Sequence, residues 1–143
     1  MINLISSEDQ LFKDQVETCK FSVSLFDHRA HLRLAYVYLV QFNNTDESVE
    51  HMKITLTNLL KHVGIEPSAK YHSTITKAWV LAVHHFLNKT ELSDSADNFI
   101  EQHPEMLNSN IMLTHYSAEL LFSEEARKSF VEPNLEPIPR HGG

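Results

Sequence analysis

Histidine is the residue type in this chain with the clearest chemical potential, because ten of the 143 residues are histidines. Three of them, His28, His31 and His72, each stand at the start of an apolar segment with helical spacing. Residues three apart lie on one face of an α-helix, so His28 and His31 can bind the same ion. Near a helix N-terminus an imidazole tends to stay neutral, which is the form that binds metal. The trio therefore predicts a metal site with His28, His31 and His72 as ligands.

The chemistry of such a site depends on the metal and on its open position. Three imidazoles suit zinc, iron, copper or nickel, and a free fourth position accepts water or a substrate. We expect Tyr71, Thr76 and Tyr116 to line that position and contact the substrate. Without a metal, His31 or His72 is the candidate general base. The sequence predicts no particular reaction, and for the metal site it predicts no catalytic residue besides the ligands.

Helices are the elements that must position these residues. Only Gly64 is an internal glycine and all five prolines lie at or after Pro67, so nothing breaks a helix in the first 63 residues. Ser7 with Gln10 is the expected N-terminal cap of the first helix, and Gly64 the C-terminal cap of the third. The expected helices cover residues 8–21, 22–42, 47–63, 69–88, a short stretch before Pro104, 105–116 and 123–131. The first two can also form one kinked helix.

The predicted fold class is all-α: a single-domain helical bundle of about five or six helices over residues 1–132. Residues 133–143 are expected to form an extended proline-rich tail along the surface. Short turns favour antiparallel neighbours, so the second and fourth helices should run in the same direction. His28, His31 and His72 would then lie in one end layer of the bundle, and the end of the 105–116 helix would bring Tyr116 back to it.

Charge and hydropathy restrict the partners and the location. The net charge of −7 argues against nucleic acid and anionic membranes, which require a basic face. The longest apolar run, residues 34–40, is too short to span a bilayer, and the N-terminus has no signal-peptide pattern. The single Cys19 cannot form an internal disulfide. We expect a cytoplasmic protein with a small-molecule ligand or substrate; the sequence predicts no oligomeric state.

Four segments resemble a family of small bacterial all-α proteins whose activity is not established. They are His28–Leu39 (HxxHLRLAxxYL), Tyr71–Val80 (YHxTxTxAWV), His103–Leu107 (HPxxL) and Tyr116–Arg127 (YSxxxLxSxxAR). The resemblance covers most of the chain and implies an all-α fold, but it implies no substrate or cofactor. In that family an acidic residue is expected after the histidine of the second motif, where this chain has Ser73. If that acid is a ligand or a base, this chain lacks it.

The leading interpretation is a metal-binding helical bundle, acting as a small metalloenzyme on a small molecule. The first alternative is a binding module for haem or another apolar molecule, held between helices near Tyr36, Tyr38, Trp79 and Phe86 with a histidine contacting the ligand. The second alternative is an interaction protein whose histidines are structural.

Overall fold

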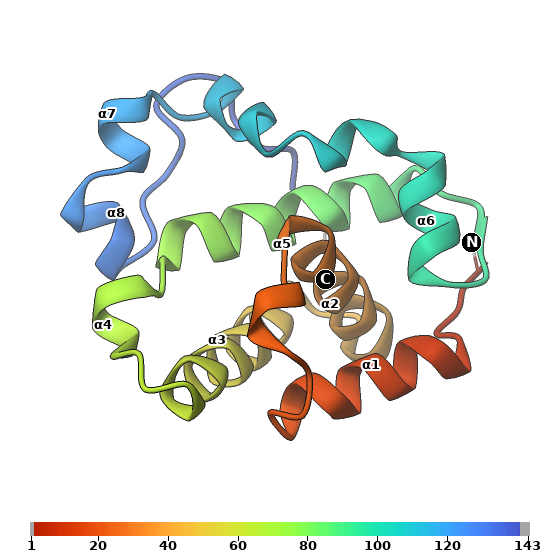
Figure 1. The fold of residues 1–143 in the computed structure, drawn as a ribbon. Coiled ribbons are helices and arrows are strands. Elements are labelled where there is room, and N and C mark those ends of the chain that lie inside the picture. The colour runs from red at the N-terminus through yellow and green to blue at the C-terminus, as the bar shows by residue number, and fades with distance from the viewer. Residues whose placement is uncertain (1, 141–143) are drawn as a thin grey trace.

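Four helices of 11 to 18 residues form the body of the protein. They are α1 (Ser7–Glu17), α2 (His28–Phe42), α3 (Thr45–His62) and α5 (Ser73–Asn88), and α2, α3 and α5 pack against one another (Figure 1). The computed structural model describes residues 2–140. The predicted all-α, single-domain fold class is confirmed, although short helical turns raise the number of α-helices in this part of the chain to eight.

Helix α2 occupies the centre of the fold, as its apolar sequence predicts. Every residue from Leu34 to Leu39 is buried, and α2 packs against α1, α3, α5 and α6 (Ala96–Gln102). A helix covered on most sides must be apolar nearly all round. The first turn of this central helix carries His28 and His31.

The N-terminal helices α1 and α2 are separate. Cys19 follows α1 with a left-handed backbone (φ 60°), and a 3-10 turn, η1 (Val23–Leu25), leads into α2. Helix α2 begins at His28 because the Asp27 carboxylate accepts the Ala30 N–H at 3.0 Å. The alternative of one kinked helix is thus excluded.

The predicted cap of α1 is wrong by one residue. Ser6, not Ser7, accepts the Asp9 N–H at 3.0 Å, and the Asp9 carboxylate accepts the Ser6 N–H at 3.2 Å. This reciprocal pair is a capping box in which aspartate takes the place of the expected Gln10. Helix α3 ends as predicted at Gly64, which follows the C-cap residue Val63 and has φ +79°, a conformation that glycine adopts without strain.

The predicted helix over residues 69–88 is divided in two. Helix α4 (Pro67–Lys70) ends before Tyr71 and His72, which are extended, and α5 begins at Ser73. The cause is the His72 side chain, whose Nδ1 accepts the Ile75 N–H at 3.0 Å and so caps α5. His72 thus precedes α5 and lies outside the helix.

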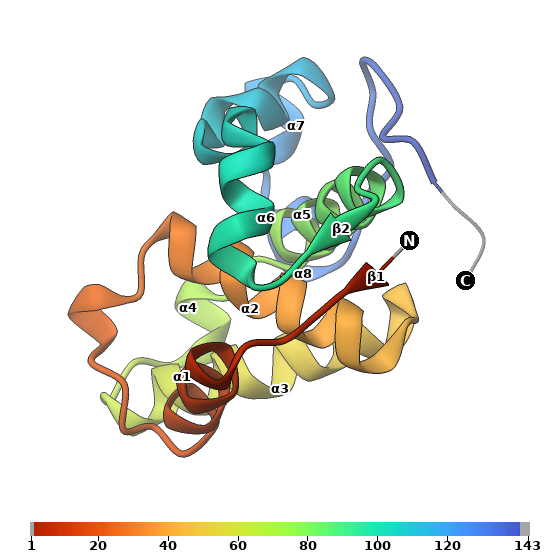
Figure 2. The ribbon, with the colours of Figure 1, turned by 90° about the vertical axis from the view of Figure 1, so that its right-hand side faces the viewer.

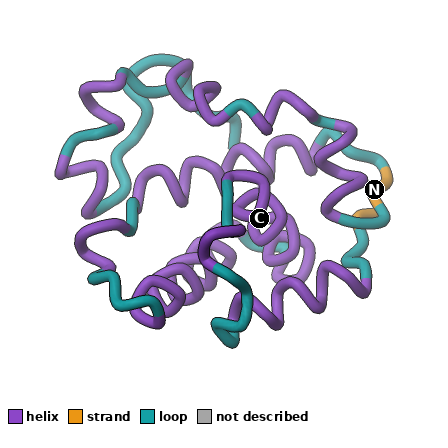
Figure 3. Tube along the Cα trace, viewed as in Figure 1, coloured by secondary structure: helices purple, strands orange, loops and turns teal. Residues whose placement is uncertain are grey.

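The C-terminal third lies across α5 on the side opposite α3 (Figure 1). It contains α6, the 3-10 segments η2 (Pro104–Leu107) and η3 (Ser109–Thr114), α7 (Ala118–Leu121) and α8 (Glu124–Lys128) (Figure 3). The predicted α-helix over 105–116 is wrong. Asn108 has an extended backbone and its side chain accepts the Asn110 N–H, which separates η2 from η3.

A pair of two-residue strands joins the N-terminus to the chain after α5. Strand β1 (Ile2–Asn3) runs parallel to β2 (Leu92–Ser93) (Figure 2). Strands this short produce no alternating pattern in the sequence, which is why none was predicted. Residues 133–140 contain no helix or strand, and Leu135 donates its N–H to the carbonyl of His115 at 2.9 Å. The end of the expected tail, 141–143, lies outside the described residues.

Candidate functional site

A cavity of about 590 Å³ lies where the N-terminal ends of α2 and α5 meet α3. The cavity is partly open to solvent, and residues of η3 and α7 complete its wall. Most of its lining is apolar. The apolar side chains include Phe26, Met52, Leu56, Leu59, Ile75, Trp79 and Met112. Its volume is typical of small-molecule sites, which measure about 300–1,000 Å³.

The three histidines singled out from the sequence all line this cavity. His28 and His31 come from the first turn of α2, and His72 comes from the residue before α5. Tyr71 and Thr76 line it as well. The hydrogen bonds of each imidazole determine which of them has a nitrogen free for a ligand.

His72 has no free ring nitrogen. Its Nδ1 accepts the Ile75 N–H at 3.0 Å, and its Nε2 lies 2.8 Å from the carbonyl oxygen of Leu121. A carbonyl only accepts, so the proton is on Nε2. Burial lowers the pKa of His72, which keeps the ring neutral, in agreement with this bonding. In this arrangement His72 joins α7 to the start of α5.

His31 keeps one ring nitrogen free. Its Nδ1 lies 3.0 Å from the carbonyl oxygen of Asp27, so Nδ1 carries the proton and Nε2 holds a lone pair. Burial lowers the pKa of His31, although the hydrogen bond to Asp27 acts in the opposite direction. The ring packs against Phe26 with centroids 4.6 Å apart. His31 is therefore a neutral, oriented imidazole.

In His28 the two ring nitrogens have the opposite roles to those in His31. Its Nε2 donates to the carbonyl of Met106 at 2.8 Å, which leaves the lone pair on Nδ1. Its ring meets Trp79 edge to face, with centroids 4.6 Å apart. Within residues 2–140 no buried polar side-chain atom lacks a hydrogen-bond partner, so the unpartnered nitrogens of His28 and His31 are accessible.

The described residues include no group of three or more His, Cys, Asp or Glu side chains placed to hold a metal ion. In the predicted trio, both ring nitrogens of His72 already form hydrogen bonds. A three-histidine metal site thus stays a prediction, and it would require His72 to give up one hydrogen bond.

Tyr116 is not part of the cavity, contrary to expectation. It is fully buried, and its hydroxyl donates to the carbonyl of Val131 at 2.6 Å. Burial raises the pKa of its hydroxyl to about 12. The segment expected as the 105–116 helix does reach the cavity through residues of η3, but Tyr116 itself does not line it. Tyr71 does line the cavity. Burial raises the pKa of its hydroxyl, and a side-chain hydrogen bond with Thr76 offsets part of this rise.

The cavity is not lined by all four aromatic residues that were expected to surround an apolar ligand. Of Tyr36, Tyr38, Trp79 and Phe86, only Trp79 lines the cavity. The Tyr36 hydroxyl instead bonds to the Leu4 carbonyl, and the Tyr38 hydroxyl bonds to Glu17. Met112 was missed because it belongs to a 3-10 segment without helical spacing. Leu56 and Leu59 on α3 also belong to the lining.

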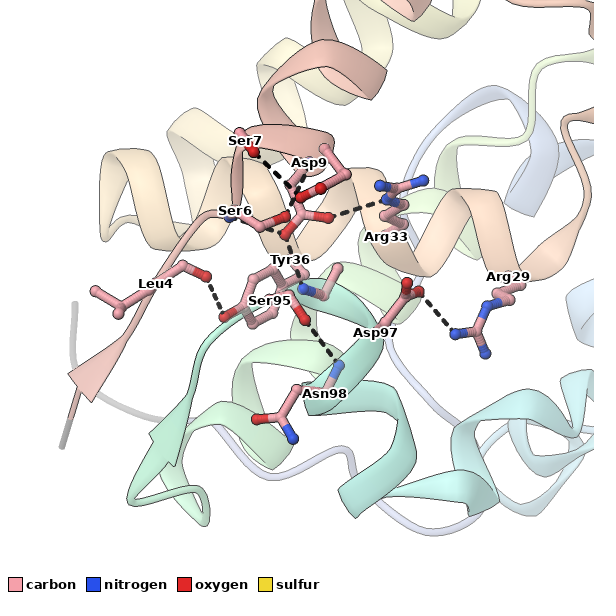
Figure 4. A network of polar contacts seen from close by, with 12 residues as sticks. Leu4, Ser6, Ser7, Asp9, Arg29, Arg33, Tyr36, Ser95, Asp97 and Asn98 are labelled. Atoms are coloured by element: carbon pink, nitrogen blue, oxygen red, sulfur yellow. Dashed lines mark hydrogen bonds and ion pairs between the residues drawn. The ribbon is translucent and has the colours of Figure 1, made fainter.

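An ion pair between Arg33 and the buried Asp9 joins α2 to α1. Asp9 is 1% exposed, and its carboxylate binds the Arg33 Nε at 3.0 Å and the Ala96 N–H at 2.8 Å (Figure 4). The Arg33 guanidinium also lies over the Phe12 ring, 4.5 Å from its centroid. One carboxylate thereby joins α1, α2 and α6.

The fold and the cavity define the class: an all-α bundle with a histidine-bearing apolar cavity. No protein-family model, curated protein or solved structure matches the chain significantly. The resemblance in its motifs therefore stays a resemblance. None of the helices within residues 2–140 is both long enough and apolar enough to cross a membrane.

Proposed function

We propose that this protein binds a small molecule with an apolar body in the cavity between α2, α3 and α5. The observation that carries the proposal is the combination of an apolar lining with two accessible imidazole nitrogens, on His28 and His31. Sites of this kind bury most of a ligand against apolar walls and orient it through a few polar groups.

The polar groups restrict the ligand further. A neutral imidazole nitrogen with a lone pair accepts a hydrogen bond or binds a metal, but it cannot donate. His28 and His31 each present one such nitrogen, so the ligand should carry a hydroxyl, an N–H or a metal ion. The net charge of −7 supports the proposal that nucleic acid and anionic membrane surfaces are not partners. The single cysteine, which cannot form an internal disulfide, is in keeping with the cytoplasm as the proposed location.

The natural fluorescence of the protein offers a direct test. Trp79 is the only tryptophan in the chain and lines the cavity, so an occupant should change its emission. The test is a titration with an anilinonaphthalene sulfonate dye, followed by Trp79 quenching. Leu60→Phe narrows the cavity and should weaken dye binding. Ile54→Phe, on the exposed side of the same helix, is the matched control. Equal binding by both variants, or no response of Trp79, would contradict the proposal.

A metal ion held by His28 and His31 is a second candidate. It is favoured by their spacing, since two rings three residues apart on α2 each keep one nitrogen unpartnered. Water or a substrate would complete the coordination, as in a small metalloenzyme. Uptake of zinc, iron, copper and nickel should then fall in both His28→Ala and His31→Ala, and stay unchanged in His62→Ala. Uptake that survives both changes excludes this site.

A further inference from the structure

We propose that the ligand of the cavity is haem, and that Nε2 of His31 is an axial ligand of its iron. This inference rests on the proposed function of the cavity, and it narrows that function to one ligand class. Four features support it. They are the hydrogen bond of His31, the number of protein side chains that a metal would need, the aromatic and aliphatic wall of the cavity, and the polar residues at its opening.

The first feature is the hydrogen bond behind the His31 ring. A histidine that binds metal through Nε2 usually donates its Nδ1–H to a carbonyl or carboxylate, which fixes the tautomer and the ring orientation. His31 has this arrangement before any ligand arrives, with Nδ1 3.0 Å from the Asp27 carbonyl oxygen. Asp27 is itself fixed as the cap of α2. The free nitrogen of His31 is thus held in a set direction.

The two other histidines of the cavity are less suited. His72 has both ring nitrogens bonded. His28 keeps Nδ1, the nitrogen nearer the backbone, because its Nε2 is held by the Met106 carbonyl at 2.8 Å. A broad macrocycle approaching Nδ1 would collide with the helix that carries the ring. Only the outer nitrogen, Nε2, leaves room for a porphyrin plane, and in this cavity only His31 offers it.

The second feature is the number of protein ligands. Protein sites for a bare zinc ion usually supply three or four side chains, and the part of the chain from 2 to 140 has no group of three or more His, Cys, Asp or Glu placed to hold one, so such an ion would have His28 and His31 alone. Haem brings four nitrogen ligands with it, so one histidine suffices, as in proteins with a proximal histidine. Met52 and Met112 also line the cavity, and a thioether is a second axial ligand in some haem proteins.

The third feature is the wall of the cavity. Phe26 and Trp79 lie beside the two histidine rings, each with a centroid distance of 4.6 Å. Aromatic side chains pack well against a flat conjugated ring. Leu56 and Leu59 cover another part of the lining. These contacts suit the apolar part of a porphyrin.

The fourth feature is the polar part of the lining. Haem carries two carboxylates, which need water or a cation. Lys70 lines the cavity and is exposed, and Ser109 and Asn110 are exposed lining residues as well. The carboxylates would therefore lie at the open part of the cavity, next to Lys70.

The experiment is a titration of the ligand-free protein with ferric haem, followed by the Soret band and by Trp79 quenching. We expect saturable binding and a shifted Soret band in the parent protein and in His62→Ala. His31→Ala should weaken binding by at least roughly tenfold, because loss of an outer-shell partner alone costs that much. Added imidazole should restore the parent spectrum of His31→Ala. His28→Ala should keep the parent Soret position, because His28 does not bind the haem iron. At a metal site held by both histidines, by contrast, His28→Ala should lower metal uptake.

Iron-free protoporphyrin separates failure of this inference from failure of the proposed function. If the dye and protoporphyrin bind but the Soret band is the same in the parent and His31→Ala, the cavity binds apolar molecules and the haem inference is overturned. If neither dye, protoporphyrin nor haem changes Trp79 emission, both proposals are overturned. Circular dichroism establishes that His31→Ala is folded. Should it unfold, His31→Gln, which retains polar side-chain atoms but no imidazole, takes its place with the same expected spectrum.

Discussion

At the scale of single residues, the same side chain has different capacities according to its hydrogen bonds. His31 and His72 both line the cavity, and burial lowers the pKa of both. A backbone N–H occupies the lone pair of His72, whereas the lone pair of His31 is free. The sequence identified these residues by type and spacing, but the type alone could not separate a capping histidine from a ligand. Whether His72 can bind a ligand depends on its tautomer. That tautomer is set by the carbonyl of Leu121, which accepts the Nε2 proton and lies 49 residues away along the chain.

The first prediction follows from the role of His72 as a cap. His72→Ala removes two hydrogen bonds and leaves the Ile75 N–H and the Leu121 carbonyl without partners. We expect a loss of about 1–3 kcal/mol in the free energy of unfolding, measured by urea denaturation. His72→Asn should cost less, since asparagine is a good N-cap. A value within about 0.5 kcal/mol of the parent, as expected for the exposed His62→Ala, would mean that the cap contributes nothing.

The second prediction concerns pH. Burial lowers the folded-state pKa of His31, His72 and His103 below the unfolded value of about 6.5. The unfolded chain therefore binds more protons than the folded one in the window below 6.5. Stability is fully present above that pH and falls as the pH drops through the window toward the folded pKa values.

Urea unfolding at pH 7.5 and at several values down to 5 measures this slope. The slope should be smaller in His31→Ala and in His72→Ala than in the parent, because each variant lacks one of the groups that titrate. Equal slopes in the parent and both variants would assign the pH dependence to other groups.

At the scale of elements, the helices with long apolar patterns were predictable and the irregular segments were not. Helix α3 lies within two residues of its predicted bounds, and α2 ends at the predicted residue, Phe42, but begins six residues later than predicted. Gly64 follows the last turn of α3 with a left-handed backbone, as expected for a glycine that ends a helix. The break before α5 and the 3-10 turns over 104–114 depend on side chains of His72 and Asn108 that bond to nearby backbone. Such local competition for backbone groups leaves no periodic pattern.

The third prediction tests the core face of α3. Leu56 is 8% exposed and packs at the edge of the cavity, while Ile54 on the same helix is 48% exposed. Leu56→Ala should lower the free energy of unfolding by about 2 kcal/mol, at the lower end of the usual range because one side of the residue already faces open space. Ile54→Ala is the control and should change it by less than about 0.5 kcal/mol. Similar values for both would place the packing face of α3 elsewhere.

At the scale of the whole molecule, the cavity is assembled from parts that are distant in the chain. From the expected parallel course of the second and fourth helices we predicted that His28, His31 and His72 lie in one layer. All three line the cavity. The wall contributed by Met112, Leu121 and their neighbours was not predictable. Its residues belong to short segments whose position is set by tertiary contacts, such as the Leu121 carbonyl on His72.

The last prediction follows from this assembly. A ligand that contacts α2, α3, α5 and the C-terminal segment at once binds the folded state and not the unfolded chain. At a free concentration of about 100 times its dissociation constant it should add about 2.7 kcal/mol to the free energy of unfolding. For a chain of this length that corresponds to a rise of roughly 5–10 °C in the melting temperature. Thermal unfolding followed by circular dichroism, with and without the anilinonaphthalene sulfonate dye, measures the rise. Leu60→Phe should lose it at the same dye concentration while Ile54→Phe retains it. A rise that is equal in the two variants would place the dye outside the cavity.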